Sequence, residues 1–313
     1  MEKRLYLVTG GAGFIGSHIC ERLLREGHAV RALDNFVSGR EENLREFQSE
    51  IDLVRGDVRD PQTLAAAMKG VYAVFHQAAL GSVPRSVADP LSTHESNITG
   101  TLNVLIAARD AGARRVVYAS SSSVYGETAE LPKHEGMTPQ PLSPYAVSKL
   151  AGEHYISIFK KCYGFEAVAL RYFNIFGPRQ DPQSQYAAVI PRFVTALIEG
   201  RRPTIYGDGR QSRDFTYVEN VVEANLLASE AEGVAGQCFN IACGGRYTLL
   251  DLLDRMKKIL GSDIEPEHTP PMKGDIRDSQ ASIERAEQRL GYRVKVDFDE
   301  GLRRTVEWFQ KQT

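Results

Sequence analysis

The sequence predicts an α/β fold in which a doubly wound parallel sheet carries helices on both faces. Short apolar runs suited to buried strands alternate with helical patterns through the first half of the 313 residues. Strands that alternate with helices in this way run parallel and are joined by crossover connections. A glycine-rich turn joins the first strand to the first helix, which is typical of sheets that bind a dinucleotide.

The glycine turn predicts a Rossmann-like pyrophosphate site. A strand pattern at residues 4–9 leads into Gly10-Gly11-Ala12-Gly13-Phe14-Ile15-Gly16, and a helix pattern covers residues 17–25. Gly10 permits the tight turn, Gly13 lets the backbone approach a pyrophosphate, and Gly16 allows close packing of helix on strand. The N-terminus of the helix offers its free N–H groups to the phosphates. We assign Phe14 and Ile15 to the same site.

Acids at the ends of the next two strands predict where adenosine binds. The second strand, residues 29–34, ends in Asp34, about 20 residues after the glycine motif, where an adenosine ribose lies. Its carboxylate can accept from both ribose hydroxyls and would repel a 2′-phosphate, so we predict NAD rather than NADP. Asn35 adds a hydrogen-bond partner. The third strand, residues 51–56, is followed by two further cofactor residues, Asp57 and Val58.

The fourth and fifth strands bring small and hydroxyl-bearing residues to the same edge. Residues 71–76 form the fourth strand, and the backbone of Gln77, Ala78 and Ala79 then passes close to the cofactor. Residues 115–119 form the fifth strand, which runs into four serines at positions 120–123. Ligands of open α/β sheets bind outside the carboxyl ends of the strands. A hydroxyl of this cluster is therefore placed to meet a substrate.

Tyr145 and Lys149 form the candidate acid–base pair. They stand four residues apart at the start of a helix pattern at residues 145–162, and residues at that spacing are neighbours on a helix surface. An unperturbed tyrosine, with a pKa of about 10, is a poor base, but a nearby lysine and a positively charged nicotinamide ring favour the phenolate. A half-buried tyrosine beside an exposed lysine is the alternative reading of the same spacing.

The second half of the chain predicts a smaller, interleaved C-terminal substrate-binding lobe. After a helix at residues 89–111 and a strand at 166–171, prolines and glycines interrupt the pattern from residue 175 onward. We expect an NAD-binding domain over residues 1–175, to which 218–242 return as a helix and a strand, and a lobe built from 176–217 and 243–313. The lobe contains predicted helices at 188–199 and 248–260, a proline-rich loop at 266–271 and a last helix with Trp308.

Composition excludes several classes of partner. The chain carries 38 basic and 40 acidic residues, a net charge of -2, so neither nucleic acid nor a membrane surface is indicated. No apolar run reaches the roughly 18 residues of a membrane helix. The four cysteines form no Cys-x-x-Cys pair and no signal peptide precedes the first strand, which indicates a cytoplasmic protein without a metal site.

Taken together, Thr9-Gly10-x-x-Gly13-x-x-Gly16, Asp57-Val58, the serine cluster and Tyr145-x-x-x-Lys149 resemble the extended short-chain dehydrogenase/reductase family over essentially the whole chain. Within it, the segments at 81–86, 170–180 and 207–215 look most like UDP-N-acetylglucosamine 4-epimerases. The resemblance makes Tyr145 the base for the sugar 4-hydroxyl. It makes Lys149 the residue that holds the nicotinamide ribose and lowers the tyrosine pKa, and Ser121 the hydroxyl that binds O4.

The resemblance also implies a UDP-sugar site. Asn174, Arg213 and Arg277 match positions that hold the UDP moiety, although Arg213 can instead pair with its neighbour Asp214. Ser279 matches a pocket-wall position that is bulky in epimerases restricted to plain hexoses, so a serine there leaves room for an N-acetyl group at C2. The remaining residues assigned to the substrate are Ser82, Arg85, Ser122, Ser123, Val189, Tyr206 and Gly207.

The expected reaction is C4 epimerisation of a UDP-sugar through a transient 4-keto intermediate. Ser122 and Ser123 stand where related dehydratases carry an Asp-Glu pair and UDP-glucuronate decarboxylases a Glu, and their absence disfavours elimination. The alternatives are a UDP-glucuronate or UDP-acetamidouronate 4-epimerase, for which Arg85 would supply charge at C6, a plain UDP-glucose 4-epimerase, a decarboxylase, or a non-catalytic NAD-binding protein. The family and two long helices imply a homodimer.

Overall fold

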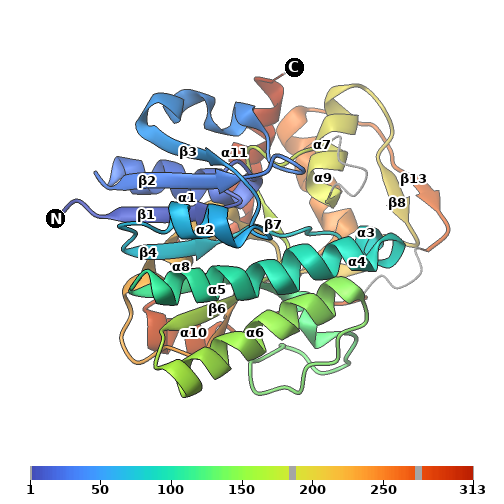
Figure 1. Cartoon of the computed structure of the whole chain (residues 1–313). Helices are drawn as coiled ribbons and strands as arrows, with labels where there is room; N and C mark the ends of the chain where they lie inside the picture. Colours follow the sequence, from blue (N-terminus) through green and yellow to red (C-terminus); the bar gives the residue numbers. More distant parts are fainter. Residues whose placement is uncertain (1, 183–187, 272–276, 313) are drawn as a thin grey trace.

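A parallel sheet forms the centre of the larger part of the molecule. The computed structural model describes residues 2–182, 188–271 and 277–312, and Figure 1 shows the whole chain. Within these residues a seven-stranded sheet has the order β11-β6-β5-β4-β1-β2-β3, and every neighbouring pair is parallel. The strands are β1 Leu5–Thr9, β2 Ala29–Asp34, β3 Ile51–Arg55, β4 Ala73–His76, β5 Arg115–Ser121, β6 Ala167–Tyr172 and β11 Cys238–Ile241. The predicted doubly wound parallel sheet is confirmed.

Helices cover both faces of this sheet because its strands are apolar on both sides. One face packs under α1 Phe14–Arg25, α8 Val218–Glu230 and α10 Glu284–Leu290, with Val8, Phe75 and Val168 in the shared core. The other face packs under α2 Pro61–Ala67, α5 Gly100–Asp110 and α6 Pro144–Tyr163, with Leu7 and Val116 in the core. Strand order reverses between β1 and β4, and ligands of such sheets bind in the crevice at that switch point.

The C-terminal part has its own apolar core. It is built by α7 Val189–Ile198, α9 Leu249–Leu260 and α11 Phe298–Gln310, with β7 Ile175–Phe176, β8 Thr204–Tyr206 and β10 Thr216–Tyr217. Phe176, Phe215 and Phe298 stack or meet edge to face at its centre. Figure 1 shows this part at the right, beside the carboxyl ends of the sheet strands.

The helix predicted at 89–111 is interrupted. The structure has α4 Pro90–His94, a π-helical turn η2 Glu95–Thr99, and then α5. A π turn inserts one extra residue into the helix, and a 3.6-residue periodicity cannot show it. The short helix α3 Val83–Ala88 precedes this run and was also not predicted.

The prediction of a loop at residues 266–271 is wrong. Residues Glu267–Thr269 form β13, which pairs in parallel with β8. The same part of the chain holds a second pairing, in which β9 Ser212–Arg213 runs antiparallel to β12 Tyr247–Thr248. Pro266 precedes the strand, where a missing N–H costs no ladder hydrogen bond. Other unpredicted turns are the 3₁₀ helices η1 Glu41–Glu50 and η3 Ser122–Tyr125.

Candidate active site

A cleft at the switch point is lined by nine of the predicted cofactor residues; Phe14, Ile15, Gly16, Tyr145 and Lys149 are not among its lining residues. It lies at the carboxyl ends of β1, β2, β3 and β4. Of the predicted residues, its walls include Gly10, Gly13, Asp34, Asn35, Asp57, Val58, Gln77, Ala78 and Ala79. The structure adds residues that the sequence did not suggest, namely Leu33, Val37, Ser38, Gly56, Leu80 and Ser96.

The glycine turn leaves no room for a Cβ at several of its positions, Gly10 and Gly16 among them. Gly10 has a φ of 68°, in the left-handed region, and a Cβ there would lie 2.7 Å from the Ala78 backbone nitrogen. A Cβ on Gly16 would lie 2.1 Å from the Gly10 carbonyl oxygen. Helix α1 begins at Phe14, three residues earlier than predicted, so Phe14, Ile15 and Gly16 contribute the first-turn N–H groups that have no acceptor inside a helix. This geometry fits a dinucleotide pyrophosphate.

Asp34 lines the cleft where the sequence predicts an adenosine ribose. Its carboxylate accepts the Ala12 N–H at 2.9 Å and the Phe36 N–H at 2.8 Å, and the residue is 5% exposed. Burial raises the pKa of Asp34, and the two N–H groups oppose that rise. Gly39 lies against it, because a Cβ there would be 2.6 Å from Oδ1. A fixed carboxylate at this place fits the two hydroxyls of an unphosphorylated ribose.

The side chains of Asn35 and Asp57 are hydrogen-bonded to each other. Asn35 Nδ2 donates to Asp57 Oδ2 at 2.8 Å, and the Arg59 guanidinium donates to the same oxygen at 2.8 Å. The Arg59 hydrogen bonds are the main reason that the pKa of Asp57 falls to about 2. Gln77 instead turns its amide toward Tyr172 and Asn225, so its backbone lines the cleft while its side chain joins the core.

Tyr145, Lys149 and Ser121 meet where α6 crosses the end of β5. Lys149 is 3% exposed; its Nζ donates to the Ala119 carbonyl oxygen at 2.8 Å and lies 5.8 Å from the Tyr145 ring centroid. Pro144 starts the helix, and Ser143 caps it by accepting the Ala146 N–H. Lys149 is therefore buried, and the alternative reading in which it is an exposed surface lysine is wrong.

The predicted lowering of the tyrosine pKa does not arise from the chain itself. Burial raises the pKa of Tyr145, and a hydrogen bond with the Ser121 side chain partly offsets this. Burial also lowers the pKa of Lys149 to about 7, which weakens the cationic charge that was expected to favour the phenolate. The correction follows from desolvation, which disfavours the charged form of both groups.

The serine cluster forms a short cap above the strand. Ser121 Oγ accepts the Ser123 N–H at 3.2 Å and so begins η3, which contains Ser122 and Ser123. Ser123 Oγ is buried and, in the described residues, has no hydrogen-bond partner. Positions 122 and 123 both hold serine and neither holds a carboxylate, so this part of the site offers only hydroxyl groups.

Asn97 was missed by the sequence reasoning. It lies in the π turn, is 1% exposed, accepts the Leu80 N–H at 2.8 Å, and donates to the Leu80 carbonyl and to Ser148 Oγ. Ser148 Oγ in turn donates to the Tyr145 carbonyl at 2.7 Å. Asn97 thus ties the cleft wall to α6. Its only signal in the sequence was a residue of low helix propensity inside a helix.

Four predicted substrate residues gather around Asp214. Asn174 Nδ2 donates to the Asp214 carbonyl oxygen, and Arg213 Nη1 donates to the carbonyl oxygens of Ser212 and Arg277. Ser279 is 6% exposed, and its N–H donates to the Ser212 carbonyl at 3.1 Å. The Asp214 carboxylate accepts the backbone N–H groups of Cys243, Gly244 and Ala281, which fix it beside these residues.

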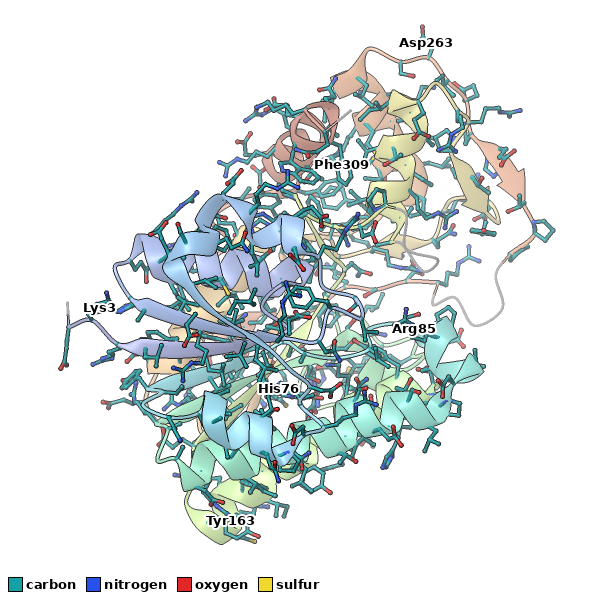
Figure 2. All side chains as sticks on the ribbon, turned by 45° about the horizontal axis from the view of Figure 1, so that its top comes forward. Lys3, His76, Arg85, Tyr163, Asp263 and Phe309 are labelled. Atoms are coloured by element: carbon teal, nitrogen blue, oxygen red, sulfur yellow. The ribbon has the colours of Figure 1, made fainter. Side chains whose placement is uncertain are left out.

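The other substrate candidates lie on separate elements. Tyr206 ends β8 below the Arg192 guanidinium, and Gly207 has a φ of 79°. Val189 is the first residue of α7. Ser82 caps α3 by accepting the Arg85 N–H, and Figure 2 shows Arg85 on that helix.

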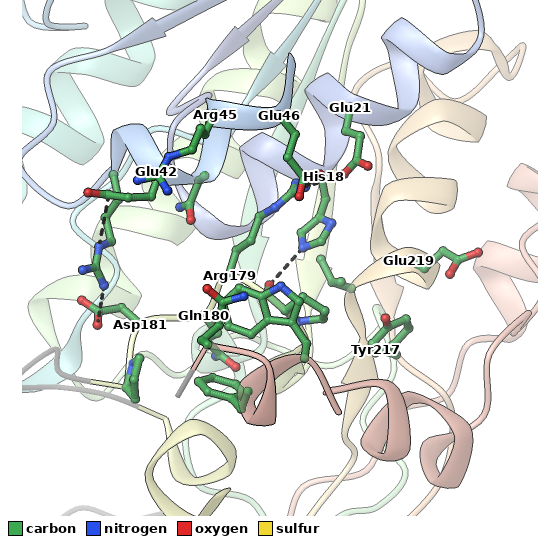
Figure 3. A pocket seen from close by; sticks show the side chains of 18 of the residues that line it. His18, Glu21, Glu42, Arg45, Glu46, Arg179, Gln180, Asp181, Tyr217 and Glu219 are labelled. Carbon is green, nitrogen blue, oxygen red and sulfur yellow. Dashed lines mark hydrogen bonds and ion pairs between the residues drawn. The ribbon is translucent and has the colours of Figure 1, made fainter. Parts of the chain in front are cut away.

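A larger cavity of about 920 Å³ is lined by residues of α1, by residues 40–46 and 178–182, and by residues of α11 (Figure 3). Arg179 pairs with Glu21 at 2.8 Å, Arg40 pairs with Asp181 at 3.0 Å, and His18 Nε2 lies 3.0 Å from the Pro178 carbonyl oxygen. These pairs connect α1 and the segment after β2 to residues 178–182. The cavity therefore lies where the sheet domain contacts the segment that leads into the C-terminal part, residues 178–182.

Two other kinds of site do not occur in the described ranges. None of their helices is long and apolar enough to cross a membrane. Within the same residues, no group of three or more His, Cys, Asp or Glu side chains is arranged to hold a metal ion.

Known proteins resemble the chain over its full length. The family model described as the NAD dependent epimerase/dehydratase family matches residues 6–242. The UDP-glucose 4-epimerase of Mycolicibacterium smegmatis is 40% identical over 312 residues, 98% of this chain and 99% of that protein.

Solved structures of UDP-sugar 4-epimerases are also similar to this chain. The UDP-N-acetylglucosamine 4-epimerase from Methanobrevibacter ruminantium M1, in complex with UDP-N-acetylmuramic acid, matches with a TM-score of 0.95, 41% identity and 100% coverage of both chains. The Thermus thermophilus UDP-glucose 4-epimerase in complex with NAD matches with a TM-score of 0.90 and 38% identity over 99% of this chain and 100% of that one. The family match and these similarities show that the chain belongs to the NAD dependent epimerase/dehydratase family.

Proposed function

We propose that this protein is an NAD-dependent 4-epimerase of UDP-sugars that interconverts UDP-N-acetylglucosamine and UDP-N-acetylgalactosamine through a 4-keto intermediate. Three features support the reaction: the Tyr145, Lys149 and Ser121 group at the end of β5, the dinucleotide cleft beside it, and the relatives that carry the name of UDP-sugar 4-epimerases. Serines at 122 and 123 favour simple epimerisation over dehydration or decarboxylation.

In the proposed cycle Tyr145 moves one proton twice. As phenolate, Tyr145 takes the proton of the sugar 4-hydroxyl while the Ser121 hydroxyl holds O4, and it returns the proton after the sugar ring has turned over. The positively charged nicotinamide ring of bound NAD would favour that phenolate against the effect of burial. The glycine turn and Asp34 would hold NAD, which would supply a reversible hydride acceptor for C4. Lys149 holds the nicotinamide ribose. The cycle has no net redox change.

The UDP anchors permit the ring to turn. Arg213, Arg277 and Asn174 hold the diphosphate in this proposal, because arginine provides bidentate donors for phosphate oxygens. The hexose meets hydroxyls of Ser121, Ser122 and Ser123, which bind it more weakly than the charged groups bind the diphosphate. Rotation about the diphosphate linkage then exposes the opposite face of C4. The lobe of residues 176–217 and 243–313 is proposed to carry the UDP-sugar.

The choice of an acetamido sugar rests on Ser279. It is a small, buried residue whose N–H donates to the Ser212 carbonyl, and by the resemblance this position is bulky in epimerases restricted to plain hexoses. A serine leaves room for the N-acetyl group at C2. The positive charge of Arg85 on α3 favours a second candidate, a UDP-sugar with a carboxylate at C6, such as UDP-glucuronate.

A substrate panel tests the proposal. The purified protein is incubated separately with UDP-N-acetylglucosamine, UDP-glucose and UDP-glucuronate, and products are followed by proton NMR. We expect the C4 epimer of UDP-N-acetylglucosamine to form fastest. An epimer from UDP-glucuronate alone supports the second candidate, a UDP-pentose from it indicates a decarboxylase, and bound NAD without turnover of any sugar indicates a non-catalytic protein.

A further inference from the structure

A buried ion pair lies directly behind the catalytic group. Arg171 on β6 donates to Glu153 on α6 through Nε to Oε1 at 2.8 Å and through Nη2 to Oε2 at 2.7 Å. The two side chains are 4% and 8% exposed. Ser120 Oγ donates to the same Oε1 at 2.5 Å. The three residues form one hydrogen-bonded unit across two strands and a helix.

This unit is in register with the catalytic residues. Ser120 lies opposite Arg171 in the β5–β6 ladder and immediately precedes Ser121. Glu153 follows Lys149 by four residues on α6, as Lys149 follows Tyr145, so the three side chains share one side of the helix. Lys149 donates to the Ala119 carbonyl. Two successive residues of β5, Ala119 and Ser120, are therefore hydrogen-bonded to side chains from two successive turns of α6, Lys149 and Glu153.

Stability alone is a weak reason for such a pair. The free energy needed to remove two charges from water offsets much of the free energy gained from their attraction. Replacing such a pair with apolar residues of similar volume often leaves a protein equally stable. Arg171 Nη1 is buried and, among the described residues, has no hydrogen-bond partner, so the pair is not fully satisfied. The arginine also lies 4.7 Å from the Tyr125 ring centroid, where apolar contact would serve as well. What charged, bidentate geometry adds is a fixed distance and orientation.

We propose that Glu153 and Arg171 are positioning residues, which with Ser120 lock α6 onto β5 and β6 so that Tyr145, Lys149 and Ser121 keep their reacting geometry. This inference rests on the proposed function, because it takes these three residues as the catalytic group. Neither Glu153 nor Arg171 is among the residues that line the cofactor cleft. They act through the helix and strand that carry the catalytic side chains.

The same two strands provide a matched control. Arg115 begins β5 and donates to Glu166, just before β6, through Nη2 at 2.5 Å and Nε at 3.1 Å. This pair joins the start of β5 to the residue before β6, at the opposite end of these strands from Ser121. A substitution there perturbs an ion pair of the sheet. Its ion-pair contact with α6, Lys160 Nζ at 3.9 Å from Glu166, lies about three helical turns from Lys149.

The experiment compares three proteins with the wild type, all loaded with NAD. Glu153→Gln keeps the size and one acceptor, the double change Glu153→Met with Arg171→Met leaves no buried charge unpaired, and Glu166→Gln is the control. Misplacing a catalytic group by about 1 Å costs on the order of 100-fold in rate, so we expect kcat to fall about 10- to 100-fold in the first two. KM and bound NAD should change little, and Glu166→Gln should keep kcat.

A second measurement does not depend on turnover. Ultraviolet titration of phenolate, taken as the difference between each protein and the same protein carrying Tyr145→Phe, follows the ionisation of Tyr145 alone. We expect this ionisation to shift in Glu153→Gln and in the double variant, and to stay in place in Glu166→Gln. Thermal unfolding shows that each variant is folded at the assay temperature.

Unchanged kcat and an unchanged Tyr145 titration in the folded double variant would overturn the inference and leave the pair a structural one. A loss of kcat matched only by a loss of folded protein, with the titration unmoved, would do the same. A wild-type protein that epimerises no UDP-sugar defeats the proposed function instead. The titration still decides, in that case, whether the pair positions Tyr145.

Discussion

At the scale of single residues, the surroundings of a glycine decide what it tolerates, as Gly10 in the glycine turn and Gly164 at the end of α6 show. Gly10 and Gly164 have nearly the same left-handed backbone, with φ of 68° and 67°. A Cβ on Gly10 would meet the Ala78 backbone at 2.7 Å, whereas on Gly164 it would meet nothing within 4 Å. The two positions therefore share backbone strain and differ in steric contact.

We predict that Gly10→Ala loses NAD binding and destabilises the fold more than Gly164→Ala. The strain of a left-handed non-glycine residue is about 1–3 kcal/mol in both, and only Gly10→Ala adds a clash with backbone beside the cofactor. Calorimetric NAD binding and urea unfolding of both variants check this. Equal losses in the two proteins would contradict the argument from the Ala78 contact.

Ser279 sets the room beside the sugar in the proposed site. Ser279→Tyr should lower kcat/KM for UDP-N-acetylglucosamine at least about 10-fold relative to UDP-glucose, since pocket size alone discriminates by about 1–3 kcal/mol. Ser279→Ala is the control and should keep the wild-type preference. Competition assays with both sugars measure the ratio. A Ser279→Tyr protein that handles both sugars as before would remove Ser279 from the pocket wall.

At the scale of elements, α6 is set by close packing on β5 as well as by its charges. A Cβ on Gly152 would lie 2.5 Å from the Tyr118 ring and its hydroxyl oxygen. Helix propensity by itself favours alanine over glycine by about 1 kcal/mol. The contact opposes it, because inserting a methyl group into a packed core costs about 1–3 kcal/mol.

Gly152→Ala should therefore destabilise the protein by about 1 kcal/mol and lower kcat by moving α6 away from Ser121. Adding Tyr118→Phe removes the hydroxyl oxygen from the contact and should recover part of the stability. Denaturant unfolding of the single and double variants gives both values. An increase in stability of the single variant would show that propensity, and not the approach of α6 to β5, decides this position.

At the scale of the whole molecule, buried histidine links stability to pH. His76, labelled in Figure 2, is buried with 1% of its surface exposed, and its ring nitrogens lie 2.7 Å from Thr9 Oγ1 and 2.9 Å from Thr101 Oγ1. Burial, with a smaller effect of the Lys149 charge, lowers its pKa from 6.5 to about 3. Between these values the unfolded chain binds the proton and the folded chain does not.

Stability should thus fall as the pH drops from about 6.5 toward 3, by at most about 1.4 kcal/mol per pH unit for this proton. His18, whose pKa burial lowers to about 4, adds to the slope in the same direction. Urea unfolding at several pH values measures the slope in the wild type and in His76→Gln. The variant should show a shallower dependence, and an unchanged slope would mean that His76 is protonated in the fold.

We propose that the protein is a homodimer, and exposed apolar residues on α5 and α6 fit this proposal. Ile106 is 37% exposed on α5, and Val147 and Ile158 are 49% and 46% exposed on α6; Figure 1 shows these helices side by side. We expect sedimentation to give a dimer that Ile158→Glu dissociates. Ile259→Glu, on α9 of the other part, is the control and should leave the dimer intact. A monomeric wild type would refute the proposal.

Much of this protein is determined locally by its sequence. The parallel strands are near-continuous apolar runs, because both of their faces are buried, and such runs are visible without knowing their partners. The glycine turn, Asp34 and the Tyr145–Lys149 spacing were likewise readable, since each depends on a few consecutive residues or on one helical turn. These patterns were enough to predict the sheet, the carboxyl-edge site and nine residues that line the cleft.

Only the tertiary structure decided the rest. Pairing of β8 with β13, the Asn97 contacts to Leu80 and Ser148, and the Glu153–Arg171 unit each join residues far apart in the chain. No local pattern encodes which distant side chain a buried polar group will meet. The direction of the Tyr145 and Lys149 pKa shifts also depends on burial, which folding sets and spacing does not show.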